Sequence, residues 1–531
     1  MNIPIVTPDQ MYKLDQVMTE KYGIPAPVLM ENAAKAVFNL LINTCKDLHA
    51  RRLVIFVGPG NNGEDALVLS RQLAVNGFHL LVVILPPLSK CKATALAKTE
   101  TLTKLDVTIM RGELPQLNPN DIVIDGIFGI GLTRPPQGRY KEAIVLINKS
   151  GVPVVSIDIS SGIDGETGIK PGVAVKSDFC VSFGNIKIGN ILYNGYTHCN
   201  ELQYSCLNSP YNQEILRLQN HGLFLNTPLP LPVRDKTGYK NAFGTCLVVG
   251  GSYNYHGAPF FASAGFMKSG GGYAHLVTTK DAALSVSAHL PECVLHPFPN
   301  DTEGTLPHDA LNLIIKLGQE QDAIVIGPGL GISKATENLL KGILDARCLI
   351  SIPAIIDGDG LSILANNQNL LNNRAPYTTI LTPHLGEMAR LTGFSVTEIQ
   401  EKLIEVAKNF AQKWKIYLVL KGPRTLITDG RTVYINTSGT KALATAGSGD
   451  VLDGIIASFI CDFPDLYKGL RTGVFAHGLI GNILSETPDS RCATASDIIK
   501  TIPDAVARLP KFYKDNKKRT PVDLPGVRYI R

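Results

Sequence analysis

Several features of secreted, membrane and nucleic-acid-binding proteins are missing from this sequence. Its 10 cysteines are scattered with no C-x-x-C pair, which argues against a disulfide framework or a zinc site and suits reduced thiols. No apolar run is long enough to span a bilayer. Met1–Asp15 also lacks the basic segment followed by an apolar one that marks a signal peptide. We therefore expect a cytoplasmic protein without a membrane partner.

The sequence also has little excess charge of either sign. Its 51 Lys and Arg face 46 Asp and Glu, a formal net charge of +5. No dense basic cluster lies in the interior, and the basic run Lys511–Arg519 is typical of a solvated terminus, so we expect no nucleic-acid partner. With 44% hydrophobic and 18% charged residues the chain is typical of globular proteins, and 531 residues exceed one ordinary core. At least two domains are expected.

The first third of the chain alternates apolar, strand-like runs with amphipathic helical patterns. The expected strands are Leu53–Val57, Leu80–Leu85, Ile122–Ile124, Val154–Ile157 and Phe179–Phe183. The expected helices are Asp9–Tyr22, Val28–Asn43, Asp65–Asn76 and Tyr140–Lys149. This alternation predicts an α/β domain with three αβα layers around a mostly parallel, Rossmann-like sheet.

Prolines alternating with leucines in Leu225–Pro232 interrupt the pattern and predict an extended connector. The alternation then resumes, and a hairpin turning at Asp429-Gly430 is expected near its end. The expected strands are Thr245–Val249, Ala323–Ile326, Ala354–Asp357, Thr379–Leu381, Tyr417–Lys421, Thr425–Thr428 and Thr432–Ile435. We therefore predict two α/β domains, spanning residues 1–220 and 225–515.

A glycine loop, Gly58-Pro59-Gly60-Asn61-Asn62-Gly63, joins the first expected strand of this sheet to a helix. A dinucleotide cofactor would need an acid about twenty residues further on to hold the ribose. The second strand instead ends in Pro86-Pro87, which disfavours NAD as a hydride cofactor. The loop's amide and carboxylate oxygens could bind a hard cation or ribose hydroxyls, whereas a plain capped turn is the alternative.

Two acids favour the functional interpretation of this loop. Asp125 and Asp158 each end a later strand of the same sheet, and each is followed by a glycine-containing loop. Because the carboxyl ends of parallel strands share one edge, we expect these acids to converge on the glycine loop.

These residues resemble the YjeF N-terminal domain, which is the NAD(P)H-hydrate epimerase, over roughly residues 8–215. The matching motifs are Leu29–Ala33, Asn61–Asp65, Asp125–Leu132 and Asp158–Gly162. The resemblance implies a K⁺ ion held by Asn62, Asp125 and Ser161, with Asp125 as the acid/base at C6 of the damaged nicotinamide. It also implies that the hydrated nucleotide contacts Asn61, Asn62, Gly63, Glu64, Asp65, Gly129, Ile130, Gly131, Leu132, Thr133, Arg134, Pro135 and Asp158.

Three positions depart from the family pattern. Glu64 replaces a glycine, Ser160 replaces a proline, and Pro86-Pro87 stands near the place of a catalytic lysine, with only Lys90 close by. We expect an intact epimerase, and an inactive epimerase-like binding domain is the alternative.

The most informative segment is Thr445–Asp450, which runs into the apolar stretch Val451–Phe459. Glycines at the start of a helix offer backbone N–H groups to a phosphate or an oxyanion. Asp450 lies in the first turn, where it can hold a hydroxyl about to receive a phosphoryl group. No P-loop motif occurs. Other polar loops after expected strands are Gly250–Ser252, Gly327–Gly331, Thr382–Glu387 and Lys421–Thr425.

These loops are similar to the ribokinase-like fold and, within it, to the ADP/ATP-dependent NAD(P)H-hydrate dehydratases, over roughly residues 228–510. The resemblance implies a catalytic Asp450, Mg²⁺ that bridges phosphate oxygens, and ADP or ATP as co-substrate. The residues implied to contact the hydrate are Ala264, Gly331, His384 and Asp450. Those implied to contact the nucleotide are Lys421, Gly422, Pro423, Arg424, Thr425 and Gly449.

The leading hypothesis is a fused repair enzyme. The first domain would interconvert the R and S hydrates of NADH and NADPH (NADHX and NADPHX), and the second would dehydrate the S form at the expense of ADP or ATP. The alternatives are a vitamin-type or small-molecule kinase, which leaves residues 8–215 unexplained, and a dehydratase fused to an inactive epimerase-like domain. A homo-oligomer is expected. The resemblance to bifunctional members implies an ADP-dependent dehydratase, whereas the residues themselves determine neither the preferred nucleotide nor the preferred hydrate.

Overall fold

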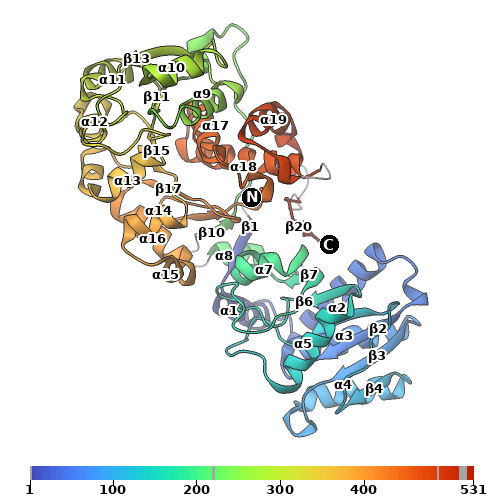
Figure 1. Cartoon of the computed structure of the whole chain (residues 1–531). Coiled ribbons are helices and arrows are strands. Elements are labelled where there is room, and N and C mark those ends of the chain that lie inside the picture. The colour runs from blue at the N-terminus through green and yellow to red at the C-terminus, as the bar shows by residue number, and fades with distance from the viewer. Residues whose placement is uncertain (1–2, 218–221, 487–489, 514–522, 531) are drawn as a thin grey trace. The chain divides into compact units, whose positions relative to one another are not determined.

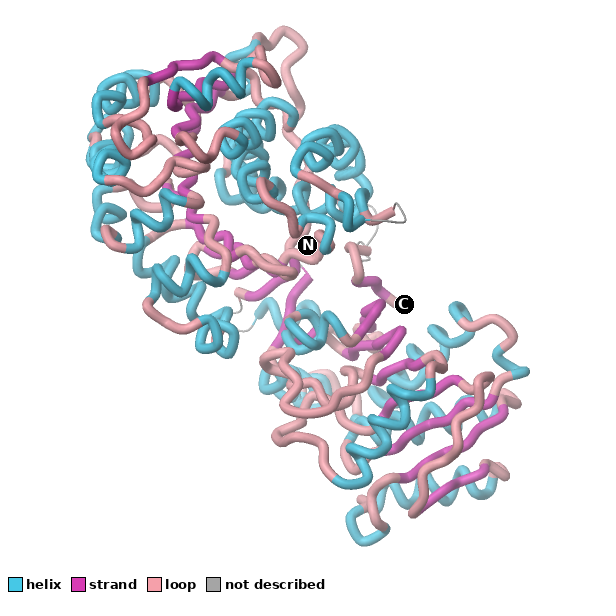
Figure 2. Tube along the Cα trace, viewed as in Figure 1, coloured by secondary structure: helices cyan, strands magenta, loops and turns pink. Residues whose placement is uncertain are grey.

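The chain separates into two compact units (Figure 1). The structure is a computed structural model that describes residues 3–217, 222–486, 490–513 and 523–530. The first unit contains residues 3–217 and also the C-terminal residues 523–530, and the second contains the rest. In each unit, helices lie on both faces of a sheet (Figure 2). None of the helices in the described part of the chain is long and apolar enough to cross a membrane.

The first unit is built on a sheet of eight parallel strands. In spatial order these are β4 (Thr108–Arg111), β3 (His79–Ile84), β2 (Arg52–Val57), β5 (Ile122–Gly126), β6 (Val154–Ile157), β7 (Ser177–Phe183), β9 (Cys199–Ser205) and β20 (Val527–Tyr529). A separate parallel pair joins β1 (Ile3–Val6) to β8 (Ile186–Lys187). The helices are α1 (Pro8–Glu20), α2 (Ala26–Thr44), α3 (Asn61–Val75), α4 (Ala93–Lys104), α5 (Gly138–Ser150), α6 (Ile188–Ile191), α7 (Tyr193–Thr197) and α8 (Tyr211–Arg217).

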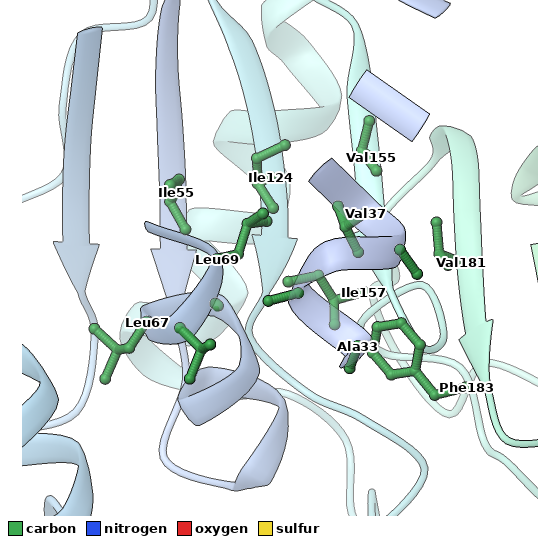
Figure 3. Close-up of a cluster of buried hydrophobic side chains, with 14 of the residues drawn as sticks. Ala33, Val37, Ile55, Leu67, Leu69, Ile124, Val155, Ile157, Val181 and Phe183 are labelled. Atoms are coloured by element: carbon green, nitrogen blue, oxygen red, sulfur yellow. The ribbon is translucent and has the colours of Figure 1, made fainter. Parts of the chain in front are cut away.

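Both faces of this sheet are apolar, as the continuous hydrophobic strands predict. On one face, Ile55 and Ile157 pack with Val37 of α2 and Leu67 of α3 (Figure 3). On the other face, side chains such as Phe56 pack against α5. Burying each such aliphatic side chain contributes about 1.5–3 kcal/mol, so the sheet is a rigid platform for the loops at its carboxyl edge.

The second unit contains a ten-stranded mixed sheet. In spatial order its strands are β13 (Val294–Phe298), β12 (Tyr273–Thr279), β11 (Thr245–Val249), β14 (Ala323–Ile326), β15 (Ala354–Ile356), β16 (Thr379–Leu381), β17 (Tyr417–Leu420), β18 (Leu426–Thr428), β19 (Val433–Ile435) and β10 (Leu223–Leu225). The pairs β17–β18 and β18–β19 are antiparallel, and the other pairs are parallel. The helices are α9 (Gly257–Lys268), α10 (Lys280–Ser287), α11 (Leu311–Gly318), α12 (Lys334–Asp345), α13 (Asp359–Ala365), α14 (Leu385–Thr392), α15 (Val396–Glu401), α16 (Leu403–Trp414), α17 (Ser448–Asp462), α18 (Leu466–Leu484) and α19 (Ala495–Arg508).

Helix α17, which begins at the predicted anion-binding segment, packs closely on α9. A Cβ at Gly265 would lie 2.7 Å from the Val451 carbonyl oxygen, and one at Gly454 would lie 2.1 Å from that of Ala262. The glycines therefore allow the two helix backbones to touch, which fixes the start of α17 against the sheet.

The predicted fold class, α/β with two layered domains, is confirmed. Every expected strand is present, and each of its ends lies within two residues of the predicted position. Strands β1, β4, β8, β9, β10, β12, β13 and β20 were not expected. The last of these returns the chain to the first unit, whereas the sequence suggested no structure beyond residue 515.

Candidate active sites

The glycine loop of the first unit touches the loop that follows β5. A Cβ at Gly58 would lie 1.7 Å from the Ile127 carbonyl oxygen, and one at Gly63 would lie 2.1 Å from the Gly58 carbonyl oxygen. Only glycine fits where backbones approach so closely. The loop is therefore held against the carboxyl edge of β5.

Asp125, at the end of β5, is fully buried and accepts four hydrogen bonds. Its Oδ1 accepts from Ser161 Oγ at 2.5 Å and from Ile127 N at 3.3 Å, while Oδ2 accepts from Ser156 Oγ at 2.8 Å and from Ser161 N at 2.9 Å. Burial raises the pKa of the Asp125 carboxyl, and the hydrogen bonds from Ser161 and Ser156 oppose that rise. Asp125 thus joins the carboxyl end of β5 to that of β6 and to the loop that follows β6.

Asn62 lies beside this network with its amide unpaired. The side chain is buried, and neither Oδ1 nor Nδ2 has a hydrogen-bond partner among the described residues. A Cβ at Gly129 would lie 3.4 Å from Asn62 Cβ, so the two loops are in contact there. A buried amide oxygen without a hydrogen-bond partner indicates a site for a ligand. Together with the oxygens of Asp125 and Ser161, the Asn62 amide oxygen is of the kind that binds a hard cation.

Glu64 is buried and pairs with two lysines from the neighbourhood of α4. Its carboxylate lies 2.5 Å from Lys98 Nζ and 3.3 Å from Lys92 Nζ, and Lys92 also donates to Asn61 Oδ1 at 2.6 Å. Burial favours the neutral acid, but these contacts together keep the pKa of Glu64 below its usual range. The negative charge at this departure from the family pattern is therefore balanced locally.

Asp158 follows β6 in a left-handed backbone conformation, with φ of 66°. Its Oδ1 accepts a hydrogen bond from Phe183 N at 3.1 Å and forms an ion pair with Lys187, which is itself buried and donates to the Phe183 carbonyl at 2.7 Å. Burial raises the pKa of the nearby Asp65 well above its usual range, and the charge of Asp158 adds to the rise.

A tyrosine from α1 reaches the predicted substrate loop 129–135. A Cβ at Gly131 would lie 2.7 Å from the Tyr12 hydroxyl oxygen, and 47% of Tyr12 is exposed. The aromatic ring thus borders the same edge of the sheet as Asp158. Burial raises the pKa of the Tyr12 hydroxyl, and the charge of Asp158 adds to the rise.

In the second unit, α17 begins with Gly447 as its N-cap, at a φ of 84° that favours glycine. The first turn contains Ser448, whose hydroxyl lies 3.3 Å from Nε2 of the buried His477. Burial lowers the pKa of His477 to about 4, so its imidazole is neutral at neutral pH. The helix start therefore presents free backbone N–H groups, and the nearby imidazole of His477 adds no positive charge to them at neutral pH.

Asp450 lies in the same turn and accepts no hydrogen bond from the described residues. Burial raises the pKa of the Asp450 carboxyl to about 7, and the charge of Asp357 adds to the rise while Lys421 opposes it. A carboxylate with a free lone pair and a pKa near neutrality is suited to accept a proton from a substrate hydroxyl.

Lys421, just after β17, contacts two carboxylates. Its Nζ donates to both oxygens of Asp357, at 2.7 and 2.8 Å, and lies 3.9 Å from Glu387 Oε2. A Cβ at Gly449 would lie 3.4 Å from both Lys421 Nζ and Asp357 Oδ2, so these groups face the first turn of α17. The ammonium is therefore close to the helix start that can receive a phosphate.

His384 is the N-cap of α14 and forms a bridge with Lys421 through the backbone. Its Nδ1 accepts hydrogen bonds from Gly386 N at 2.9 Å and Glu387 N at 3.3 Å, while Glu387 Oε2 accepts from His384 N at 2.8 Å. Since Nδ1 is an acceptor, the proton of the neutral ring resides on Nε2. The side chain is 56% exposed, and its Nε2 lies 3.6 Å from Glu387 Oε1.

Two family models match the chain, each within one unit. The model described as NAD(P)H-hydrate dehydratase matches residues 246–504, and the one described as YjeF-related protein N-terminus matches residues 26–189. A bifunctional NAD(P)H-hydrate repair enzyme Nnr from Thermofilum pendens is 36% identical over 95% of this chain and 97% of its own length. The chain belongs to the bifunctional NAD(P)H-hydrate repair enzyme family.

Other family members match at similar coverage. The Nnr proteins of Moorella thermoacetica and Dictyoglomus turgidum are 32% and 31% identical, over 95% and 94% of this chain and 97% and 98% of theirs. The chain is also similar to a solved structure, the ADP/ATP-dependent NAD(P)H-hydrate dehydratase from Bacillus subtilis co-crystallised with ATP and Mg²⁺. The sequence identity is 27% and the TM-score is 0.44. The match covers 54% of this chain and 99% of the Bacillus subtilis chain. The resemblance stated from the motifs is thus confirmed at the level of the family.

Not every predicted contact residue is open to a ligand. Ala264 is buried in α9, and Arg424 is buried and donates to the Thr437 carbonyl oxygen. Gly422 is exposed, whereas Gly331 donates its N–H to Asp359 Oδ2 at 2.8 Å. The roles of Ala264 and Arg424 stay predictions, and the geometry favours an indirect role for Arg424 through the loop that contains Thr437.

The sequence analysis missed several residues that the structure brings to these sites. In the first unit they are Tyr12, Lys92, Lys98, Ser156 and Lys187, and in the second they are Asp357, Asp359, Asp453 and His477. Asp357 directly follows β15 and Asp125 lies at the end of β5, so the strand-end signal used for Asp125 would have found Asp357 too. Lys92 and Lys98 give no signal of this kind, because they come from a neighbouring helix.

Proposed function

We propose that the two units carry two consecutive activities on hydrated nicotinamide nucleotides. The first unit epimerises the R and S forms of NADHX and NADPHX, and the second dehydrates the S form to NADH or NADPH at the expense of ADP or ATP. Asp450 carries this assignment: its carboxylate accepts no hydrogen bond from the described residues, has a pKa of about 7 and lies at a helix start beside Lys421. Family membership supports the same conclusion.

In the dehydratase, the oxygen of the hydrate's C6 hydroxyl attacks the terminal phosphorus of the nucleotide. Asp450 accepts the proton of that hydroxyl during the attack. The P–O bond to the remaining nucleotide breaks, and the N–H groups of residues 446–449 with Lys421 stabilise the charge on the transferring group. The ring nitrogen then expels phosphate from C6. Loss of a C5 proton restores the double bond.

Mg²⁺ fits this site only together with the nucleotide. Among the described residues, no group of three or more His, Cys, Asp or Glu side chains is arranged to hold a metal ion. We therefore propose that Mg²⁺ is held by phosphate oxygens and water, where it would neutralise phosphate charge.

In the epimerase, K⁺ fits the cluster of oxygen ligands formed by Asn62, Asp125 and Ser161. The unpaired, buried amide of Asn62 is the observation that supports it. The ion would fix the two glycine loops relative to each other. We propose that the hydrate lies along Asn61–Asp65, the loop 129–135 and Asp158, with Asp125 as the acid/base at C6.

The pairing of Glu64 with Lys92 and Lys98 supports an intact epimerase. An unpaired carboxylate here would repel a dinucleotide, whereas the ion pairs leave one net positive charge beside the start of α3. A homo-oligomer and a cytoplasmic location stay predictions from the sequence.

One assay separates the activities. Purified protein is given racemic NADHX with ADP or ATP, and recovery of the dihydropyridine absorbance is followed. Full recovery is expected. Recovery that stops at half, after correction for spontaneous epimerisation, means that the epimerase is inactive. A stable phosphorylated product would indicate a kinase, and no recovery with either nucleotide would overturn the assignment.

A further inference from the structure

Asp453 is a fully buried acid that the mechanism above does not use. It lies on α17 one turn after Asp450, and its Oδ1 accepts a hydrogen bond from Thr382 Oγ1 at 3.1 Å. Its Oδ2 is also buried but accepts no hydrogen bond from the described residues. An ionised carboxylate held in this way, with one neutral donor and no cation of its own, would be costly to bury.

A second carboxylate lies beside it. Asp357, after β15, is also buried, and its side chain acts on that of Asp453 through its charge and as a hydrogen-bond partner. Asp357 also faces the helix at Gly449, where a Cβ would lie 3.4 Å from Asp357 Oδ2. Two carboxylates this close share a proton, because both cannot be charged in the same apolar surroundings.

The contacts decide which of the two carries the proton. Both oxygens of Asp357 bind Lys421 Nζ, at 2.7 and 2.8 Å, which stabilises the charged form there. Among the described residues, Asp453 accepts a hydrogen bond from the Thr382 hydroxyl alone, although the charge of Lys421 also acts on it. A proton on Asp453 Oδ2 can be donated to Asp357, and Oδ1 can still accept from Thr382, so that every polar atom of Asp453 has a partner.

We propose that Asp453 is a positioning residue that is protonated at neutral pH: its Oδ2–H donates to Asp357 and so holds the Asp357–Lys421 pair next to Asp450. The role in catalysis rests on the proposed dehydratase function, whereas the location of the proton does not. Burial, and after it the charge of Asp357, raises the pKa of Asp453 well above its usual range, which also favours the protonated form.

The charges around Asp453 show what the proton does for the site. Asp357, Asp450 and Glu387 are the acids that face it or Lys421, with Asp359 further out, and Lys421 is the cation among them. On the packed helix α18, His477 is neutral because burial lowers its pKa to about 4. A charged Asp453 would raise the pKa of Asp450 further and so reduce the fraction of active base at neutral pH. The neutral acid avoids this while still holding Asp357.

Two substitutions separate the proton from the shape of the side chain. Asp453→Asn is nearly isosteric, and its amide can donate to Asp357 and accept from Thr382. Asp453→Leu has a similar volume but neither donor nor acceptor. Infrared difference spectra of wild type minus Asp453→Asn, taken at neutral pH on the full chain, report a protonated carboxyl directly through its C=O stretching band.

We expect the wild-type spectrum to contain this band. Asp453→Leu should lower kcat for dehydration of S-NADHX by about tenfold or more, the effect of an unsatisfied buried acceptor. It should also shift the acid limb of the kcat/KM profile to higher pH, because the charge of Asp357 is then less dispersed. Asp453→Asn should restore most of kcat and the wild-type limb.

Absence of the infrared band, or an acid limb in Asp453→Asn displaced to lower pH, would mean that Asp453 is ionised and would overturn the proposal. Wild-type kcat and pH profile in Asp453→Leu would overturn the positioning role. If Asp453→Leu does not fold, the infrared spectrum and the Asp453→Asn profile still decide. If the wild type has no dehydratase activity, the band still locates the proton, so the two failures are distinguishable.

Discussion

The two acids predicted to be catalytic, Asp125 and Asp450, have opposite surroundings. Asp125 ends a strand of the first unit, is fully buried and accepts four hydrogen bonds from Ser156, Ser161 and Ile127. Asp450 lies in the first turn of a helix of the second unit and accepts none from the described residues. Burial raises the pKa of both carboxyls, but hydrogen bonds oppose the rise only in Asp125.

This difference separates two uses of a carboxylate. Four hydrogen bonds fix the position of Asp125 and orient its oxygens toward the two loops, which suits an anchor for a cation and for the loop backbones in addition to its proposed acid/base role at C6. Asp450 has free lone pairs and a pKa of about 7, which suits a base that takes and releases a proton.

Asp450→Asn should lower the rate of dehydration about 10²–10⁴-fold, since the proton of the C6 hydroxyl loses its acceptor. Epimerisation should be unaffected, because Asp450 belongs to the other unit. The measurement is kcat for S-NADHX with ATP, alongside R-to-S conversion followed by chromatography. Asp462→Asn, at the far end of the same helix, is the matched control and should retain activity. Equal losses in both variants would contradict the role of Asp450.

Asp125→Asn should abolish epimerisation and also reduce the free energy of unfolding of the first unit by about 1–3 kcal/mol. The amide nitrogen cannot accept the hydrogen bonds that the carboxylate oxygen does, and the Ser161 backbone N–H has no other acceptor there. Urea unfolding and R-to-S conversion are measured together. Asp178→Asn, an acceptor for Val154 N at the opposite edge of the sheet, should lower stability without affecting epimerisation. Unchanged stability in Asp125→Asn would refute its anchoring role.

Lys98→Met should reduce kcat/KM of the epimerase about tenfold, because Glu64 then retains only the longer ion pair with Lys92 and a buried charge is partly uncompensated. Adding Glu64→Gly should reverse much of the loss, since the charge itself is gone. Lys104→Met on the same helix, whose exposed partner is Glu100, is the control and should have little effect. A double variant worse than the single one would show that Glu64 itself serves the reaction.

Ending the chain at residue 522 removes β20 and should lower the stability of the first unit by about 1–3 kcal/mol, mainly through loss of the buried Val527. Hydrogen exchange should increase in β9, where the Tyr204 carbonyl accepts from Ile530 N at 2.9 Å. Arg528→Ala, which removes an exposed ion pair with Glu201, is the matched control. Unchanged exchange in β9 would mean that the C-terminal strand adds nothing to this sheet.

Much of the fold follows from the sequence because buried parallel strands are continuous apolar runs, as in β2 and β14. Strand β9 was missed because its first half, Cys199–Glu201, is polar and reads as a loop. Strand β20 was missed for another reason. It is three residues long, and it acquires its structure from the register with Leu202–Tyr204, more than three hundred residues earlier in the chain.

The candidate sites were predictable where residues follow strands in sequence. Asn62, Asp125, Ser161 and Lys421 lie where strand ends place them. Contributions from neighbouring helices, such as Lys98 on α4 or Tyr12 on α1, depend on tertiary packing that leaves no local pattern. The raised pKa of Asp450 likewise leaves no local sequence pattern, because it results from burial and from the charge of Asp357, which is distant in sequence.

The most direct test of this account is the pH dependence of kcat/KM for dehydration of S-NADHX with saturating ATP. The base must be ionised to act, and the raised pKa of Asp450 means that it is protonated below about 7 and ionised above. The rate should therefore fall about tenfold per pH unit on the acid side of that midpoint and level off above it. Residual activity in Asp450→Asn should lack this limb. A flat wild-type profile down to the usual range of aspartate, or the same limb in Asp450→Asn, would contradict the assignment of Asp450 as the free base.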